Sequence, residues 1–317
     1  MAKIIKKLAI LGQGLIGSSI TRACFERKLA DEIIITDNSP KVRRRLLELG
    51  LGAAKVVDTN GEAVKDADLI IGCVPVAAYA ALVAEIAPYL KPGAILSDVG
   101  SVKLSIIEDT LKVLPKNVHF VPGHPLAGTE FSGPDAGLPK LFVNRWCILT
   151  PVPGTPDKAT ETLKALWEAM GSKVEIMTPG RHDRALAITS HLPHLAAFSI
   201  FHTALAEEEK SGSPVIQFSA GAFKDFTRIA SSNPTMWRDI FLKNKEPLLD
   251  VFRKFIADME SCVEAIETDN GEMLEEFMSK SRLTRRKIIE KEHISLLPDE
   301  DDSDLADTIF RPYSSGD

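Results

Sequence analysis

The sequence predicts an α/β protein: a Rossmann-type domain with a mostly parallel sheet, residues 1–178, followed by an all-helical domain, residues 179–293. In the first 178 residues, short runs of β-branched and aliphatic residues alternate with longer amphipathic segments, which is typical of βαβ units. Beyond them, apolar residues recur at the helical spacings i, i+3, i+4 and i+7, as at Leu248, Val251 and Phe252. With 317 residues, the chain is long enough for two domains that each bury a core.

The seven expected strands are short apolar runs. In chain order they are Leu8–Leu11, Ile33–Thr36, Leu69–Gly72, Ala94–Asp98, His119–Pro122, Cys147–Thr150 and Val174–Met177. The segments of helical length among them are Leu15–Lys28, Pro40–Leu49, Val76–Leu90, Val102–Leu114 and Pro156–Met170. Since parallel strands need a crossover of about a dozen residues, these helices favour a parallel sheet.

The helical half has more apolar positions than one small bundle needs for its core. This excess favours a homodimer that forms through the helical domain, with a role in the core alone as the alternative. Residues 294–317 hold seven acidic residues and one basic residue. We expect an acidic, disordered tail there.

Composition excludes several classes of protein. The net charge is −6, and the acids and bases of the body balance once the tail is left out, which argues against a broad basic surface for nucleic acid. The four cysteines form no C-x-x-C motif, which favours reduced thiols over disulfides or a zinc knuckle. The uncharged run Leu69–Ala84 contains Gly72 and Pro75 and falls short of the roughly 18 residues of a membrane helix. We expect a cytoplasmic protein that binds neither nucleic acid nor membrane.

A glycine-rich motif follows the first expected strand and opens the first expected helix. It reads Gly12-Gln-Gly14-Leu15-Ile16-Gly17, in the strand–turn–helix context of a dinucleotide fingerprint. A missing side chain allows a tight turn at Gly12, approach of the pyrophosphate at Gly14 and close helix–strand packing at Gly17. The helix N-terminus then offers N–H donors to the phosphates, with Leu15 and Ile16 beside them.

An acidic residue stands where a dinucleotide site needs one. Asp37 follows Gly17 by twenty residues, at the end of the second expected strand, where a carboxylate accepts hydrogen bonds from the adenosine ribose and repels a 2′-phosphate. Arg43–Arg45 begin the next helix and leave NADP as the alternative. We expect NAD as the cofactor and Val74 as a further residue of its site.

Four more clusters place polar groups among small and apolar residues: Asp98–Lys103, Gly123–Glu130, Ser190–His194 and Phe223–Arg228. Together with the glycine motif, in this order and spacing, they resemble the prephenate/arogenate (cyclohexadienyl) dehydrogenases of tyrosine biosynthesis. The resemblance spans about residues 7–292. It implies an NAD-dependent oxidative decarboxylation of prephenate, or of arogenate, to 4-hydroxyphenylpyruvate, or tyrosine, and CO2.

Such a reaction requires a proton acceptor at the substrate C4 hydroxyl, cations for two carboxylates and a dry nicotinamide pocket. His124 is expected just beyond a strand, at the sheet edge where α/β proteins bind ligands, and a neutral imidazole accepts a proton near pH 7. The resemblance makes His124 the catalytic histidine. It makes Ser101 a catalytic residue that bonds the hydroxyl and the nicotinamide end, although Ser101 is also placed to cap the helix expected from Val102.

His191 and His194 are three residues apart, a spacing that also occurs in metal sites. Pro193 between them and the lack of an H-E-x-x-H motif argue against zinc, and we expect no metal. The resemblance makes His194 a substrate-binding residue that His191 and Ser190 support. A structural role at the start of a helix is the alternative.

Lys224 and Arg228 are four residues apart and would share one helix face. A planar guanidinium holds a carboxylate with two hydrogen bonds, so we expect Arg228 to bind a substrate carboxylate and Lys224 to assist it. The alternative is an exposed face on which Asp225 pairs with Arg228. The resemblance also implies that Lys224 acts across the dimer interface. It adds three residues that line or gate the pocket: Thr129, Glu130 and Trp237.

Two other functions compete with this interpretation. One is another two-domain NAD-dependent hydroxyacid dehydrogenase, although histidines stand where such enzymes place a lysine. The other is a non-catalytic NAD-binding scaffold. Preference between prephenate and arogenate depends on one or two pocket contacts, since the two substrates differ only in a keto or an amino group on the side chain.

Overall fold

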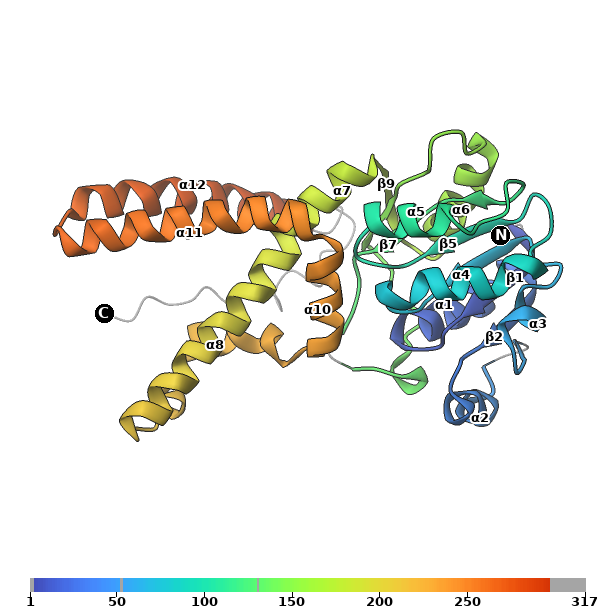
Figure 1. Cartoon of the computed structure of the whole chain (residues 1–317), viewed down its shortest axis with the longest axis horizontal. Helices are drawn as coiled ribbons and strands as arrows, with labels where there is room; N and C mark the ends of the chain where they lie inside the picture. The colour runs from blue at the N-terminus through green and yellow to red at the C-terminus, as the bar shows by residue number, and fades with distance from the viewer. Residues whose placement is uncertain (1–2, 52–53, 130, 297–317) are drawn as a thin grey trace, which may run out of the picture. The chain divides into compact units, whose positions relative to one another are not determined.

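The computed structural model describes residues 3–51, 54–129 and 131–296, and their side chains as far as residue 289 (Figure 1). The chain divides into two compact units between Phe252 and Arg253. The domain boundary expected after residue 178, which rests on the change of secondary structure, stays a prediction. Of the expected acidic tail, residues 297–317 lie outside the described part of the chain.

The larger sheet has six parallel strands. Side by side they lie in the order β3 (Lys55–Val56), β2 (Ala30–Thr36), β1 (Ile5–Leu11), β4 (Leu69–Gly72), β5 (Ile95–Asp98) and β6 (His119–Phe120). Leu8 of β1 pairs with Ile33 on one side and Leu69 on the other. This order is that of a Rossmann fold, whose ligands bind at the carboxyl ends of the strands where the order reverses, here between β1 and β4. The predicted fold class is confirmed.

A second sheet carries one of the expected site residues. Its strands are β7 (Gly123–Pro125), β8 (Trp146–Leu149) and β9 (Lys173–Ile176). β7 is antiparallel to β8 and pairs His124 with Ile148, whereas β8 and β9 are parallel. His124 therefore lies within a strand and not just beyond one as expected. A strand of three residues is too short to show an alternating pattern in the sequence.

Helices α1 to α6 connect the strands: α1 (Leu15–Glu26), α2 (Pro40–Leu49), α3 (Asn60–Val64), α4 (Tyr79–Ile86), α5 (Leu104–Leu111) and α6 (Asp157–Ala169). The rest of the described chain is helical: α7 (Pro179–Leu186), α8 (Leu192–Ser211), α9 (Gly221–Thr227), α10 (Pro234–Lys243), α11 (Lys245–Glu267) and α12 (Gly271–Leu296). None of these helices, within the described ranges, is both long and apolar enough to cross a membrane.

Local signals explain where several elements begin and end. α2 and β4 have the predicted bounds, and α2 starts with Pro40 behind a Ser39 cap and stops at Gly50 with φ +54°. α4 is shorter than predicted because Pro88 has no N–H to continue an α-helix, and 3-10 turns flank it instead. β3 and α3 escape prediction because such short segments show no period.

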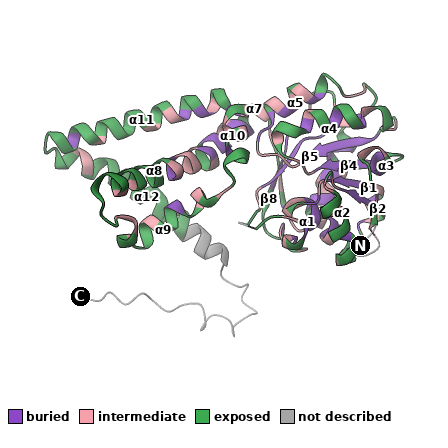
Figure 2. Ribbon diagram, turned by 60° about the horizontal axis from the view of Figure 1, so that its bottom comes forward, coloured by how far each residue is buried: buried purple, intermediate pink, exposed green. Residues whose placement is uncertain are grey.

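Alternate side chains of the parallel strands pack on opposite faces of the sheet. Leu8 and Ile10 join one core with α1, α2 and α6, in which Trp167 is buried. Ala9 joins another core with α3, α4 and α5, which contains Tyr79. Figure 2 shows these strands buried while the outer surfaces of the helices are exposed. Helices thus cover both faces, as a parallel sheet requires.

A buried ion pair joins β5, the start of α5 and β7. The Lys103 ammonium lies 2.5 Å from the Asp98 carboxylate and donates to the Gly123 carbonyl at 2.6 Å, and both charged side chains are fully buried. Asp98 also accepts N–H groups from Gly100 and Gly123. Burial lowers the pKa of Lys103, and the Asp98 charge opposes that shift. Each ion is thus paired and makes at least one further hydrogen bond, as buried charges require.

Replacing Lys103 with Met should leave the Asp98 carboxylate buried without its cation. We expect the free energy of unfolding, measured by urea denaturation, to fall by roughly 3–5 kcal/mol. The matched control is Lys112→Met, which removes an exposed lysine paired with Glu108 and Asp109 and should leave stability nearly unchanged. A Lys103→Met variant no less stable than this control would contradict the role of the buried pair.

Candidate active site

The glycine motif forms a turn that only small residues allow. Gly12 has φ +87°, and a β-carbon there would lie 2.5 Å from the Cys73 carbonyl oxygen. A β-carbon at Gly17 would lie 1.9 Å from the Gly12 carbonyl oxygen, so α1 packs closely on the turn. At Gly14 a β-carbon would meet no atom within 4 Å. Gly14 thus faces open space at the N-terminus of α1, where a pyrophosphate fits.

Asp37 lies at the end of β2 and faces this turn. Its Oδ2 accepts the Gln13 N–H and its Oδ1 accepts the Ser39 N–H, both at 2.9 Å. Gln13 is itself buried and bonds Thr21 and the Ile10 carbonyl. The carboxylate is thereby held beside the glycine motif, where the ribose of a dinucleotide would lie.

Two of the three arginines that leave NADP as the alternative make contacts with protein groups. Arg43 donates to the Asp37 carbonyl at 2.8 Å and pairs with Asp58. Arg45 pairs with Asp135 and Glu48. Their guanidinium groups therefore already have protein acceptors. This favours a ribose without a 2′-phosphate, whose hydroxyls the Asp37 carboxylate would bind.

His124 is buried in β7, and its ring makes one polar contact. Its Nδ1 lies 2.8 Å from Nε2 of His182, and its Nε2 has no hydrogen-bond partner among the described residues. Burial lowers the pKa of His124 well below 6.5, and the nearby His182, Lys103 and His191 lower it further. His124 is thus a neutral imidazole with one nitrogen available to a ligand.

His182 and Asp183 of α7 continue the contact away from His124. His182 Nδ1 lies 2.8 Å from Asp183 Oδ1. The Asp183 carboxylate also accepts the backbone N–H groups of Lys103 and Leu104 at 2.8 and 2.9 Å. Asp183 thereby caps α5, so the cap expected from Ser101 is wrong; Ser101 lies before the N-terminus of α5 without a described hydrogen bond.

A second group of side chains surrounds His194. Its ring stacks on Trp237 with centroids 3.7 Å apart, and its Nδ1 lies 2.8 Å from the Ser190 carbonyl oxygen. Asn244 donates to His191 Nδ1 at 2.9 Å. Burial lowers the pKa of His191 to about 4 and lowers that of His194. The structure thus places the His194 ring against Trp237 and the Ser190 backbone, and a substrate pocket formed by these residues stays a prediction.

His191 ends a π-helical turn, Ala187–His191, between α7 and α8, and His194 lies in the first turn of α8. Such turns often occur at functional sites, and here Pro193 lacks the N–H that a regular α-helix would use. Among the described residues no group of three or more His, Cys, Asp or Glu has a metal-binding arrangement. The histidine rings instead make hydrogen bonds and ring contacts with protein groups.

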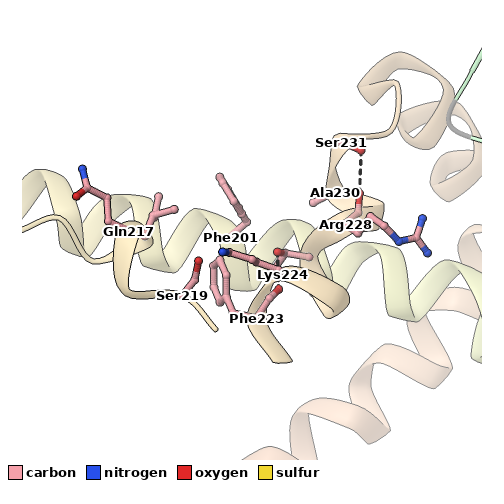
Figure 3. Close-up of a pocket in the computed structure, with 10 residues that line it drawn as sticks. Phe201, Gln217, Ser219, Phe223, Lys224, Arg228, Ala230 and Ser231 are labelled. Carbon is pink, nitrogen blue, oxygen red and sulfur yellow. Dashed lines mark hydrogen bonds between the residues drawn. The ribbon is translucent and has the colours of Figure 1, made fainter. Parts of the chain in front are cut away.

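Arg228 and Lys224 line a separate, exposed cavity of about 680 Å³ (Figure 3). α9 ends at Thr227, so Arg228 opens a 3-10 turn instead of continuing a shared helix face as expected. The two side chains extend in opposite directions in Figure 3. Neither pairs with Asp225, and neither makes a described polar contact with His124 or His194.

The sequence predicts three further site residues. Val74 is half-buried beside the glycine turn, 3.2 Å from a β-carbon built at Gly12. Thr129 is exposed on the loop after β7 and accepts the Phe131 N–H. Glu130 lies outside the described residues.

No local pattern in the sequence marks four further residues of the site: His182, Asp183, Lys103 and Asn244. His182 and Asp183 stand between Arg181 and Arg184, in a segment that looks like an exposed helix start. Their burial depends on α7 packing against α5, which no local pattern shows. A polar residue buried by tertiary contacts leaves no periodic signal.

Family models match both halves of the chain. The model for the nucleotide-binding domain of prephenate dehydrogenase matches residues 16–176, and that for the dimerization domain of prephenate dehydrogenase matches residues 178–280. The chain is 42% identical to a cyclohexadienyl dehydrogenase of Zymomonas mobilis over 282 residues, 89% of this chain and 96% of the relative. It is 35% identical to a prephenate dehydrogenase of Bacillus subtilis over 273 residues, 84% of this chain and 72% of the relative.

Solved structures agree with these matches. The crystal structure of prephenate dehydrogenase from A. aeolicus in complex with hydroxyphenyl propionate and NAD+ has a TM-score of 0.82 and 31% sequence identity, covering 90% of this chain and 98% of that chain. A Synechocystis arogenate dehydrogenase has a TM-score of 0.76 and 25% identity, covering 89% and 99%.

Replacing Asp37 with Ser should weaken NAD binding by roughly 10- to 100-fold, because hydrogen bonds to a charged acceptor are lost. Discrimination against NADP should fall at the same time, since the carboxylate no longer repels a 2′-phosphate. Titrations of the purified protein with both cofactors measure this. Asp31→Ser, at the opposite end of β2, is the control and should change neither affinity. Unchanged cofactor affinities in Asp37→Ser would place the ribose elsewhere.

Proposed function

This chain belongs to the prephenate dehydrogenase family, and on that premise we propose that it catalyses the NAD-dependent oxidative decarboxylation of prephenate, arogenate or both. The products are 4-hydroxyphenylpyruvate or tyrosine, with CO2, in tyrosine biosynthesis. Within the family, the observation that carries the proposal is the buried, neutral His124 with Nε2 free for a substrate hydroxyl. The direct test follows NADH absorbance with prephenate and arogenate, each with NAD and NADP.

His124 is the proton acceptor in this proposal. Its Nε2 takes the proton of the C4 hydroxyl, which a neutral imidazole does without first losing a proton of its own. The bound nicotinamide supplies the hydride acceptor, and loss of CO2 makes the ring aromatic. Ser101, in the loop between β5 and α5, is the second group that bonds the hydroxyl. Burial of His124 and His182 keeps water from the proton transfer.

The residues of the glycine motif hold the cofactor. Gly14 offers the open approach to the pyrophosphate, and the α1 N-terminus has no acidic residue in its first turn to oppose a phosphate. Asp37 bonds the ribose hydroxyls. NAD is favoured over NADP because the Asp37 carboxylate repels a 2′-phosphate, and two of the three nearby arginines, Arg43 and Arg45, are paired with acids.

The substrate site combines His194, Trp237 and Ser190 with cations that we assign to a second copy of the chain. A homodimer through the helical part is supported by the family's dimerization domain and by exposed apolar side chains. Ile200 on α8 and Ile256 and Val263 on α11 are 43%, 42% and 50% exposed. Arg228 and Lys224 make no described polar contact with His124. In this proposal they bind substrate carboxylates across the interface.

The pH dependence of kcat/KM should show the lowered pKa of His124. The base works in its neutral form, so activity is lost as pH falls through the folded pKa, which lies well below 6.5. We expect kcat/KM for prephenate to stay level down to pH 6.5 and to fall only below it. A decline centred above pH 6.5 would contradict the assignment.

Replacing His124 with Asn removes the base and should lower kcat by roughly 10²- to 10⁴-fold, with NAD affinity unchanged. His119→Asn, in the neighbouring strand β6, is the matched control and should keep near-normal turnover. Near-normal turnover in His124→Asn would remove that residue from the chemistry.

Mixing two impaired variants, assayed with prephenate well below KM, tests whether Arg228 acts across a dimer. Arg228→Gln should raise KM for prephenate by about 10-fold or more, because a charged hydrogen bond is lost. After subunit exchange between Arg228→Gln and His124→Asn proteins, random pairing should restore about a quarter of the wild-type sites. If the mixture shows no recovery although exchange is complete, Arg228 serves the site of its own chain.

A further inference from the structure

We propose that His182 and Asp183 are positioning residues that hold His124 in the tautomer able to accept the substrate proton. The proton acceptor is then a chain of two imidazoles and one carboxylate, His124–His182–Asp183, and not a lone histidine. This inference deepens the proposed function, in which His124 Nε2 accepts the C4 hydroxyl proton. It rests on two contacts of 2.8 Å between fully or nearly fully buried side chains.

Asp183 fixes one end of the chain as an acceptor. Its Oδ1 accepts the Lys103 N–H and lies 2.8 Å from His182 Nδ1, and its Oδ2 accepts the Leu104 N–H. Two backbone N–H groups and one imidazole nitrogen thus converge on two oxygens. Since a carboxylate bonded in this way is an acceptor only, His182 must carry its hydrogen on Nδ1.

The tautomer of His182 then decides that of His124. A neutral imidazole with its hydrogen on Nδ1 has its lone pair on Nε2, the atom that lies 2.8 Å from His124 Nδ1. His124 must therefore donate from Nδ1, which leaves its own lone pair on Nε2. The opposite tautomer would put a hydrogen on Nε2 and abolish the base.

The same chain stabilises the charge that the reaction creates. When the substrate O–H bond breaks, its electron pair stays on oxygen and a new N–H bond forms at His124 Nε2. The resulting imidazolium donates through Nδ1 to His182, which polarises toward the negative Asp183. The other charged or titratable groups facing the pair are Lys103 and Asp98, which neutralise each other, and His191. Asp183 therefore supplies the unbalanced negative charge.

Two variants of His182 separate positioning from a merely structural role. His182→Gln keeps an amide oxygen that can accept from His124 Nδ1, whereas His182→Leu fills the space without any acceptor. We expect kcat for prephenate with saturating NAD to fall by about 100-fold or more in the Leu variant, with KM within about threefold. The Gln variant should recover at least about 10-fold of that loss. Thermal stability and NAD binding show whether both variants are folded.

A spectroscopic measurement on the wild-type protein keeps the proposal testable if a variant does not fold. In ¹⁵N-histidine-labelled protein with NAD bound, His124 should be protonated on Nδ1 and unprotonated on Nε2, its signals being assigned by their loss in His124→Asn. Protonation on Nε2 would overturn the proposal, as would equal kcat losses in the Gln and Leu variants. Absence of turnover in wild type with prephenate and arogenate would instead reject the proposed function. The ¹⁵N spectrum would still show the tautomer of His124 and so test this inference separately.

Discussion

The buried ion pair of Lys103 and Asp98 is the constraint on which the rest of the site depends. Two charges removed from water need each other and further hydrogen bonds, and here the ammonium donates to the Asp98 carboxylate and to the Gly123 carbonyl. Because Gly123 begins β7, this requirement fixes where that strand meets the end of β5. His124 is the next residue, so the position of its ring follows from the same pair.

Asp183 forms a second link, between the sheet domain and the helical segment. One carboxylate caps α5 through two backbone N–H groups and contacts His182, so α7 cannot shift without uncapping α5. Asn244 of the turn after α10 donates to the Asp183 carbonyl and to His191, which joins both histidine groups in one hydrogen-bond network. Orientation of the base and stability of α5 therefore depend on the same side chain.

The parts of this molecule that sequence predicts are those that local rules determine. Gly12 and Gly17 are required by contacts within one turn, and Asp37 by its spacing from the glycine motif within one βαβ unit. All three can therefore be predicted from the sequence. His182 and Asp183 function through partners 58 and 80 residues away, and no local rule contains those partners. The prediction that Lys224 and Arg228 share one helix face is wrong for a related reason. α9 ends at Thr227, and helical spacing alone does not show where a helix ends.

Separation of the cations from the base has a physical rationale. A guanidinium placed permanently beside His124 would lower the pKa of that imidazole further and would itself be buried without a partner. Exposed positions keep Arg228 and Lys224 solvated until a substrate arrives with its carboxylates. The internal charges, Lys103 with Asp98 and Asp183 with its N–H donors, are already satisfied and cannot bind an anion. In the proposed mechanism, attraction of a dicarboxylate therefore comes from the exposed cations, and the buried histidines accept the proton.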